Sequence, residues 1–249
     1  MCIVCHKPEA ELIHLTDIDC SYCPSLTSIP STLVKLQKLS CHHCPLLEII
    51  PSTLINLQIL VCSWCPLLTL IPSTLVNLQS LFCARCPIIT IPLTLVNLHT
   101  LSCSLGNIPL LVSLKELHCS DSSTLTTIPS TLINLHCLDC YDCPLLTNIP
   151  STFVKLNYLS CGYCPLLFSI PSTFINLTSF KLYGCSYCYI PFNFKQKFEV
   201  DNNNKVSIFT SKLRKRWRRI QSKRMTTLLN EEKKEIPVVI NQLVTSYLF

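Results

Sequence analysis

The sequence predicts a parallel-strand solenoid of about nine units, and a repeat with a period of 21 residues is the main reason. Successive cysteines lie 21 residues apart in two runs, Cys20, Cys41, Cys62, Cys83 and then Cys119, Cys140, Cys161. Self-similarity on this scale is typical of repeat arrays, in which each unit buries its apolar face only against its neighbours. Two further observations, an apolar alternation of period two and a proline-containing return segment, recur in each unit.

Residues 36–54 show how one unit is expected to fold. Leu39 and Cys41 are two residues apart, so on a strand both side chains point to one face, while Lys38 and Ser40 point to the other. The Ile-Pro-Ser-Thr segment that follows returns the chain, because proline fixes its own backbone angle and disfavours helix just before it. We therefore expect stacked parallel strands on one side and loops, short turns or 3₁₀ pieces on the other.

The unit resembles the leucine-rich repeat over about residues 12–191. The family's Leu, Leu and Leu or Cys before an Asn or Cys are matched at Leu57, Leu60, Cys62 and Cys65. Residues 71–78 are similar to the Ile-Pro variety of plant receptors, while the dense cysteines and scarce glycines resemble repeat proteins of giant DNA viruses of amoebae. The resemblance implies an α/β-type horseshoe with the parallel β-sheet on its concave face and a non-enzymatic, partner-binding role.

One unit is short. Cys103 and Cys119 are only 16 residues apart, because Gly106 and Asn107 directly precede Ile108 in place of the usual Cys-Pro-Leu-Leu. We expect the strand ladder to continue across this unit, since the apolar spacing before Cys119 is kept. At the N-terminus, residues 2–5 are a candidate for a degenerate tenth unit.

The chain divides into a solenoid at 1–191 with a degenerate N-terminal unit at 1–19, a cap and linker at 192–211, and a basic helical tail at 212–249. Residues 1–194 carry a net charge of −2 and residues 195–249 a net charge of +8. The tail begins with a basic cluster, Lys212, Arg214, Lys215, Arg216, Arg218 and Arg219. It is interpreted as a solvated or cap-stabilising helix, a nucleic-acid or nuclear-import segment, or an amphipathic partner-binding helix.

The last segment, residues 235–249, resembles the opening of an F-box, the segment that docks repeat-bearing adaptors onto ubiquitin ligases. Only the first third of an F-box is matched. The alternative is a helix that packs back on the solenoid.

Whether the nineteen cysteines form disulfides depends on the redox compartment in which the protein resides. No apolar stretch is long enough to span a membrane and no secretory leader is seen, so we expect an intracellular protein, in the host cytoplasm or virion with the nucleus as an alternative. The thiols should then be mostly free. The Cys-x-x-Cys pairs raise zinc and redox interpretations, but their places in the unit favour buried thiols that act as small apolar groups. No metal and no cofactor are therefore predicted.

No nucleophile, base and orienting acid can be assembled, and no glycine-rich phosphate loop exists, so no enzyme is predicted. Binding is expected on the outward strand positions, where one set is aromatic, aliphatic and basic: Ile59, Val61, Trp64, Phe82 and Arg85. A second set is mainly acidic: Glu116, Asp121, Asp139 and Asp142. The expected partner is a host or viral protein, with nucleic acid as an alternative through the tail and no membrane or small-molecule substrate.

Overall fold

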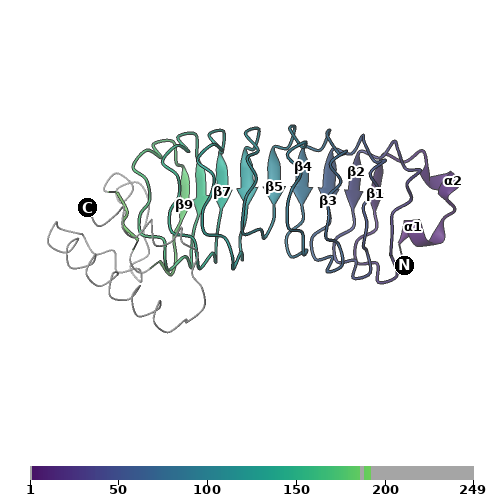
Figure 1. The fold of residues 1–249 in the computed structure, drawn as a ribbon, viewed down its shortest axis with the longest axis horizontal. Coiled ribbons are helices and arrows are strands. Elements are labelled where there is room, and N and C mark those ends of the chain that lie inside the picture. The colour runs from purple at the N-terminus through teal and green to yellow at the C-terminus, as the bar shows by residue number, and fades with distance from the viewer. Residues whose placement is uncertain (1, 186–187, 192–249) are drawn as a thin grey trace. The chain divides into compact units, whose positions relative to one another are not determined.

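The computed structural model describes residues 2–185 and 188–191, all within the first of two compact units, Met1–Val206 and Ser207–Phe249. The described chain coils into a solenoid whose nine strands form a single parallel sheet in chain order (Figure 1). The strands are β1 Asp17–Asp19, β2 Lys38–Ser40, β3 Ile59–Val61, β4 Ser80–Phe82, β5 Thr100–Ser102, β6 Glu116–His118, β7 Cys137–Asp139, β8 Tyr158–Ser160 and β9 Ser179–Lys181. The predicted solenoid with a parallel sheet is confirmed.

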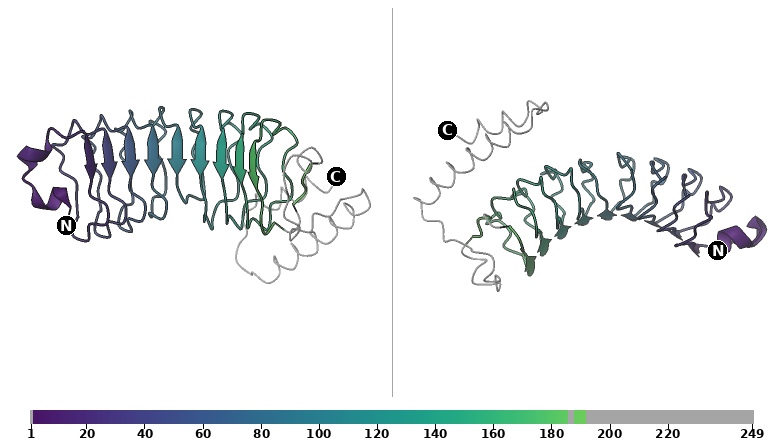
Figure 2. Two further views of the ribbon diagram at one scale, coloured as in Figure 1. Left: turned by 180° about the vertical axis from the view of Figure 1, so that it is seen from behind. Right: turned by 90° about the horizontal axis from the view of Figure 1, so that it is seen from below.

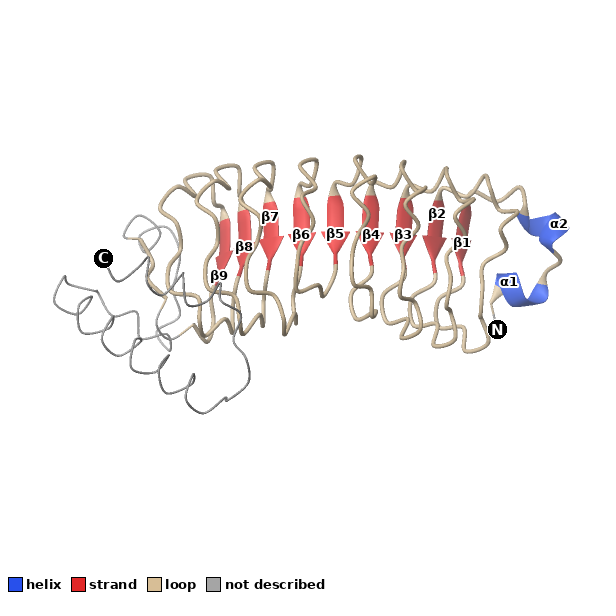
Figure 3. Cartoon of the chain, viewed as in Figure 1, coloured by secondary structure: helices blue, strands red, loops and turns tan. Residues whose placement is uncertain are grey.

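The strands lie along the inner side of the curved array, and the return segments form its outer side (Figure 2). Figure 3 shows the strands side by side in a single row. Each strand is three residues long, and the side chain of its central residue points into the core of the solenoid. The central leucines pair in register from one strand to the next, as Leu39 with Leu60 and Leu60 with Leu81. These leucines are fully buried, and burying each one is worth about 1.5–3 kcal/mol.

The return segments are built from tight turns. Within one unit, the amide of Leu54 donates to the carbonyl of Pro51 and the amide of Leu57 donates to that of Leu54. Two side chains then link this return segment to the one before it. The hydroxyl of Thr53 donates to the Ser31 carbonyl at 2.6 Å, and the amide of Asn56 donates to the Val34 carbonyl at 2.9 Å.

The same two bonds recur along the array. Equivalent threonines at 74, 94, 152 and 173, and equivalent asparagines at 77, 97, 134 and 176, make them. The Thr and Asn of the repeated Ser-Thr-Leu-x-Asn-Leu pattern therefore satisfy backbone carbonyls that have no regular secondary structure to pair with.

A ladder of thiols performs the same task inside the coil. The Sγ of Cys44 donates to the carbonyl of Cys20 at 3.2 Å, and the Sγ of Cys65 donates to that of Cys41 at 3.1 Å. Equivalent bonds are made by the second cysteines at 86, 143, 164 and 185. We call these second cysteines, from Cys23 to Cys185, the rung positions. The prediction that both cysteines of a pair lie inside the coil is confirmed, except that Cys86 is only half-buried.

The short unit keeps the sheet intact, as predicted, because β5 pairs with β6 at Leu101 and Leu117. Its return side is drawn in so closely that a Cβ on Gly106 would lie 2.7 Å from the Thr124 Oγ1. In the next unit the rung position holds the buried Ser122, whose hydroxyl donates to the Leu105 carbonyl at 2.9 Å. A serine at a rung position can therefore donate to a carbonyl of the preceding unit, here that of Leu105 rather than that of the first cysteine, Cys103.

Two short helices, α1 Ile3–His6 and α2 Glu9–Leu12, precede the first strand. Leu12 is fully buried in the solenoid core. Residues 2–5, the candidate for a tenth unit, therefore do not form a strand: Cys2 directly precedes α1, and residues 3–5 belong to it. The expected cap at 192–211, the basic cluster at 212–219 and the F-box-like segment at 235–249 lie outside the described residues.

The rung bonds predict a difference between two substitutions at Cys65. Cys65→Ala leaves the buried Cys41 carbonyl without a donor, which costs about 1–3 kcal/mol, whereas Cys65→Ser keeps a hydroxyl donor as Ser122 does. In urea unfolding followed by circular dichroism, Cys65→Ala should therefore have the lower midpoint. Equal midpoints for the two variants would show that the thiols act only as apolar filling.

Candidate protein-interaction surface

A row of residues in the left-handed backbone region follows the strands. Tyr22, His43, Trp64 and Arg85 have φ angles of 57°, 56°, 62° and 59°, and each is the residue just before a rung cysteine. The amides of Tyr22, His43 and Trp64 continue the ladder of the sheet, as where Tyr22 donates to the His42 carbonyl at 2.8 Å. The left-handed turn bends the chain out of the strand and leaves these side chains at its edge.

The four side chains stack on one another because equivalent residues of adjacent parallel strands are about 4.8 Å apart. The ring of Tyr22 stacks on that of His43 with centroids 4.8 Å apart and planes at 8°. His43 stacks in turn on Trp64, at 5.2 Å and 14°. The guanidinium of Arg85 lies over the Trp64 ring, 4.5 Å from its centroid. We call these four side chains the stacked row.

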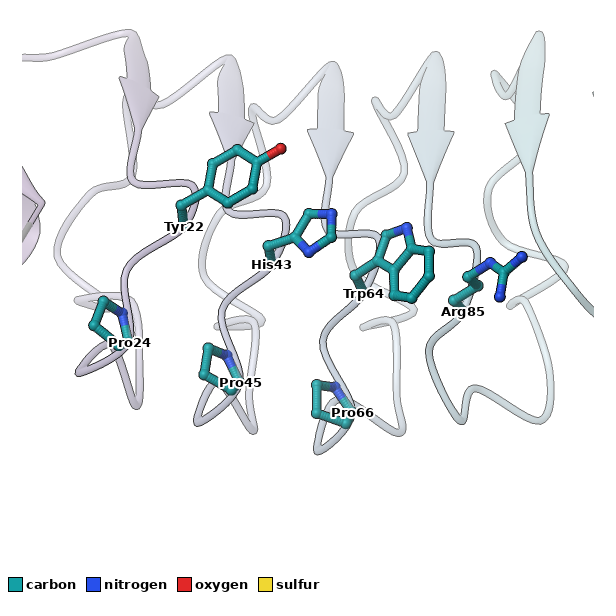
Figure 4. Close-up of a pocket in the computed structure, with 7 residues that line it drawn as sticks. All are labelled: Tyr22, Pro24, His43, Pro45, Trp64, Pro66 and Arg85. Atoms are coloured by element: carbon teal, nitrogen blue, oxygen red, sulfur yellow. The ribbon is translucent and has the colours of Figure 1, made fainter.

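The stacked row forms one wall of a shallow groove of about 490 Å³ (Figure 4). The other wall is a row of prolines, Pro24, Pro45 and Pro66, each two residues after a member of the stacked row. The groove therefore runs across successive units rather than along one unit. Its walls are mainly rings, and Trp64 is 47% exposed while Tyr22 is 68% exposed.

The structure divides the first predicted set between two places. Ile59, Val61 and Phe82 lie on the outward face of β3 and β4, where all three are half-buried and Val61 pairs in register with Phe82. Trp64 and Arg85 are not on the strands but in the turns that follow them. All five residues belong to two adjacent units, as predicted.

The second predicted set lies three units further along, in the units of β6 and β7. Glu116 on β6 accepts a hydrogen bond from the Thr100 hydroxyl at 3.2 Å, and Asp139 on β7 is half-buried. Asp121 and Asp142 occupy the left-handed positions of their units. The structure joins the two sets through an ion pair, in which Arg85 Nη2 lies 2.5 Å from Asp121 Oδ2.

The ion pair crosses the short unit. That unit offers Ser104, whose hydroxyl accepts a hydrogen bond from the Arg85 amide, and among the described residues it contributes no left-handed position. Arg85 and Asp121 are consequently neighbours in the row although they are 36 residues apart.

Tyr22 and His43 were not among the predicted site residues, although both line the groove. The signal was present in the sequence, since Tyr22, His43, Trp64 and Arg85 share the period of 21. It was missed because the left-handed turn, and hence the stacking of these side chains, cannot be read from hydrophobic alternation alone.

A second groove, of about 550 Å³, borders the other end of the strands. It is lined mainly by amide side chains, among them Gln58, Asn56 and Asn77. Asn56 and Asn77 already donate to backbone carbonyls, so part of this polar lining serves the solenoid itself.

Most first cysteines of the pairs are held in the protonated form, whereas hydrogen bonds from neighbouring thiols lower the pKa of Cys86 to about 3 and that of Cys164 to about 4. Burial raises the pKa of Cys103 and of Cys188 to about 12, and it raises that of Cys83 well above its usual range. Protonated, buried thiols are poor nucleophiles and poor metal ligands. This environment argues against zinc or redox chemistry at those thiols whose pKa is raised by burial.

The solenoid of parallel strands, with the sheet on its inner side, defines a leucine-rich-repeat fold. Comparison with family models agrees: residues 35–57, 56–78 and 134–156 match the Leucine Rich Repeat model. No curated protein sequence matches the chain significantly.

Several solved structures are similar. The functional domain of InlJ from Listeria monocytogenes, which includes a cysteine ladder, aligns with a TM-score of 0.61 and 25% identity over 71% of this chain and 40% of that chain. The ectodomain of the receptor kinase GASSHO1/SCHENGEN3 from Arabidopsis thaliana, in complex with CASPARIAN STRIP INTEGRITY FACTOR 2, aligns with a TM-score of 0.50 and 28% identity over 66% and 23%. The chain thus spans less than half the length of either.

The leucine-rich-repeat domain of the type III effector XopL is similar in fold, with a TM-score of 0.51 and 22% identity over 76% of this chain and 67% of that one. None of the helices in the described part of the chain is long and apolar enough to cross a membrane.

Burial predicts which thiols react. In chelator-treated native protein, iodoacetamide should label the exposed Cys5 first and the half-buried Cys2, Cys86 and Cys137 more slowly, leaving the fifteen buried cysteines unlabelled until unfolding. Because burial raises the pKa of Cys137 to about 11, its labelling should keep accelerating as the pH rises through 9 and 10. Peptide mapping by mass spectrometry measures both effects, and rapid labelling of Cys41 or Cys62 in native protein would contradict this account.

Proposed function

We propose that this protein is a non-enzymatic scaffold or adaptor that binds a partner protein through the strand side of its solenoid. The leucine-rich-repeat fold is commonly a protein-interaction scaffold, and the concave face is its usual binding surface. The proposed contact surface combines the stacked row with Ile59, Val61 and Phe82. The continuous stack from Tyr22 to Arg85 is the observation that carries this proposal.

Preorganisation supports this role. Each ring of the stacked row is fixed by its neighbours at 4.8–5.2 Å, so little side-chain entropy remains to be lost on binding. Trp, Tyr and Arg are also the residue types that most often dominate binding energy at interfaces. A partner that covers the stacked row would therefore gain large contact areas at a small ordering cost.

The backbone supports it as well. Bulky residues are uncommon in the left-handed region, where glycine fits without strain, and the last unit does place Gly184 there. Tyr22, His43, Trp64 and Arg85 instead keep large side chains at this strained position. Such strain is often retained where the side chain has a function, and because Tyr163 shares the left-handed backbone, it is the continuous stacking that distinguishes the stacked row.

The groove suggests what part of the partner binds. Its walls of rings and prolines are apolar, and it crosses about four units, or roughly 15 Å at the spacing of parallel strands. An extended segment of about four or five residues has this length. We propose that an extended, mainly apolar segment of a host or viral protein lies along the groove, with Arg85 and Asp121 at its end.

The matched variants Trp64→Ala and Tyr163→Ala test this proposal. Both remove an exposed aromatic side chain at a left-handed position, but only Trp64 belongs to the stacked row. Partners captured by the full chain from host-cell lysate should bind Trp64→Ala at least tenfold more weakly, since interface hot spots cost about 2 kcal/mol or more. Affinity for Tyr163→Ala should be unchanged.

Unfolding midpoints of the two variants should agree, which separates lost contact from lost folding. Phe82→Asp offers an independent probe of the strand face, because its side chain is half-buried there. A partner whose dissociation constant is the same for wild type, Trp64→Ala and Phe82→Asp would refute binding at this surface.

The alternative functions involve the tail, through nucleic acid or through ubiquitin-ligase docking by the F-box-like residues 235–249. The charge of +8 in residues 195–249 favours the former. Replacing the six basic residues of 212–219 by glutamine should then abolish nucleic-acid binding that weakens steeply with added salt. Retention of nucleic acid by that variant would exclude the basic cluster of 212–219 as the binding element.

We also propose an intracellular location. All nineteen cysteines are free thiols in the structure, and thiols persist in reducing compartments. Because the repeats resemble those of giant-virus proteins, we propose that the protein meets its partner in the cytoplasm of an infected host or in the virion.

A further inference from the structure

Three cysteines meet at the N-terminal end of the solenoid. Cys2 precedes helix α1, Cys5 lies within it, and Cys23 is the rung position of the first unit. The Sγ atom of Cys5 lies 3.6 Å from that of Cys2 and 3.6 Å from that of Cys23, and all three sulphurs lie within 4.8 Å of one another. Among residues 2–185 and 188–191, no other group of three His, Cys, Asp or Glu ligand atoms comes this close.

Cys23 differs from the other rung positions in what its thiol contacts. Cys44 donates to the carbonyl of Cys20 in the unit before it, but Cys23 belongs to the first unit and β1 is the edge of the sheet. Its Sγ instead contacts Cys5 and, at 3.7 Å, the Oγ of Ser25. The rung thiol of the first unit is thereby directed to two other sulphurs rather than to the backbone.

The spacing of the sulphurs suits a metal ion. With Zn–S bonds of about 2.3 Å and tetrahedral angles, neighbouring sulphurs lie about 3.8 Å apart, close to the two separations of 3.6 Å. A disulfide would require about 2.05 Å. Thiolates are also the ligands that zinc prefers among soft donors.

We propose that Cys2, Cys5 and Cys23 together bind one Zn²⁺ ion, with water in the fourth position because Cys5 is exposed. Each thiol gives up its proton as the ion binds, so binding strengthens with rising pH. The Ser25 hydroxyl, 3.7 Å from Cys23 Sγ and 3.8 Å from Cys5 Sγ, is placed to donate a hydrogen bond to the thiolates.

The proposed zinc site has a structural role at the N-terminal end of the solenoid. Helices α1 and α2 have only four residues each, far below the length at which a helix is stable alone. The ion links α1 to the turn after β1, and so holds the helical segment over the first unit. Terminal units of a solenoid need such a cover for their exposed core.

Cobalt provides the test. The full chain, reduced and stripped of metal under anaerobic conditions, should bind one Co²⁺ with intense near-ultraviolet thiolate-to-cobalt absorption and visible bands of tetrahedral cobalt, and Zn²⁺ should displace it. Zn²⁺ should also slow alkylation of Cys5 at least tenfold. Cys5→Ser and Cys23→Ser should lose the absorption.

Cys44→Ser is the matched control, because it changes the same rung position one unit later. Ser122 shows that serine is accepted at such a position, so both rung variants should fold, and only Cys23→Ser should lose cobalt. Absence of thiolate-to-cobalt absorption in the wild type would overturn the proposal. Absorption that persists in Cys5→Ser, or a Cys5–Cys23 disulfide in anaerobically purified protein, would also overturn it.

Discussion

The structure of this protein depends on contacts between equivalent residues of successive units, most of which are 21 positions apart in the sequence. Parallel strands can hydrogen-bond only at a separation of about 4.8 Å, and this spacing brings each side chain against its equivalent in the next unit. The leucines then form the core, the rung thiols, threonines and asparagines donate to backbone carbonyls, and the rings of the stacked row lie face to face. A single distance therefore decides the core, the satisfaction of the backbone and the candidate binding surface.

The sequence allowed the fold to be predicted because repetition makes local information sufficient. The period of 21, the alternation around Leu39 and the proline of each return segment place strand and turn in every unit without knowledge of distant contacts. Even the short unit was predicted to continue the sheet, since the spacing of Leu114, Leu117 and Cys119 is unaffected. The burial of both cysteines in each pair could be predicted from their fixed positions within the repeat unit.

The site was predicted less completely, because it depends on backbone geometry that alternation does not reveal. Ile59, Val61 and Phe82 were placed correctly on the strand face, since position along a strand determines which way a side chain points. Trp64 and Arg85 lie past the strand end, where a left-handed residue redirects the chain. The pairing of Arg85 with Asp121 depends on a missing left-handed position in the short unit, and the meeting of Cys2, Cys5 and Cys23 depends on how α1 folds back.

The short unit also bears on how the chain finds its native alignment. Units this similar can stack on the wrong neighbour during folding with little loss of contact energy, which creates competing compact states. The close approach of Gly106 to Thr124 and the bond from Ser122 to the Leu105 carbonyl fit only one pair of units. A chain in which one unit stacks on the wrong neighbour loses these contacts. The irregular unit therefore favours the native alignment of the repeats over misaligned ones.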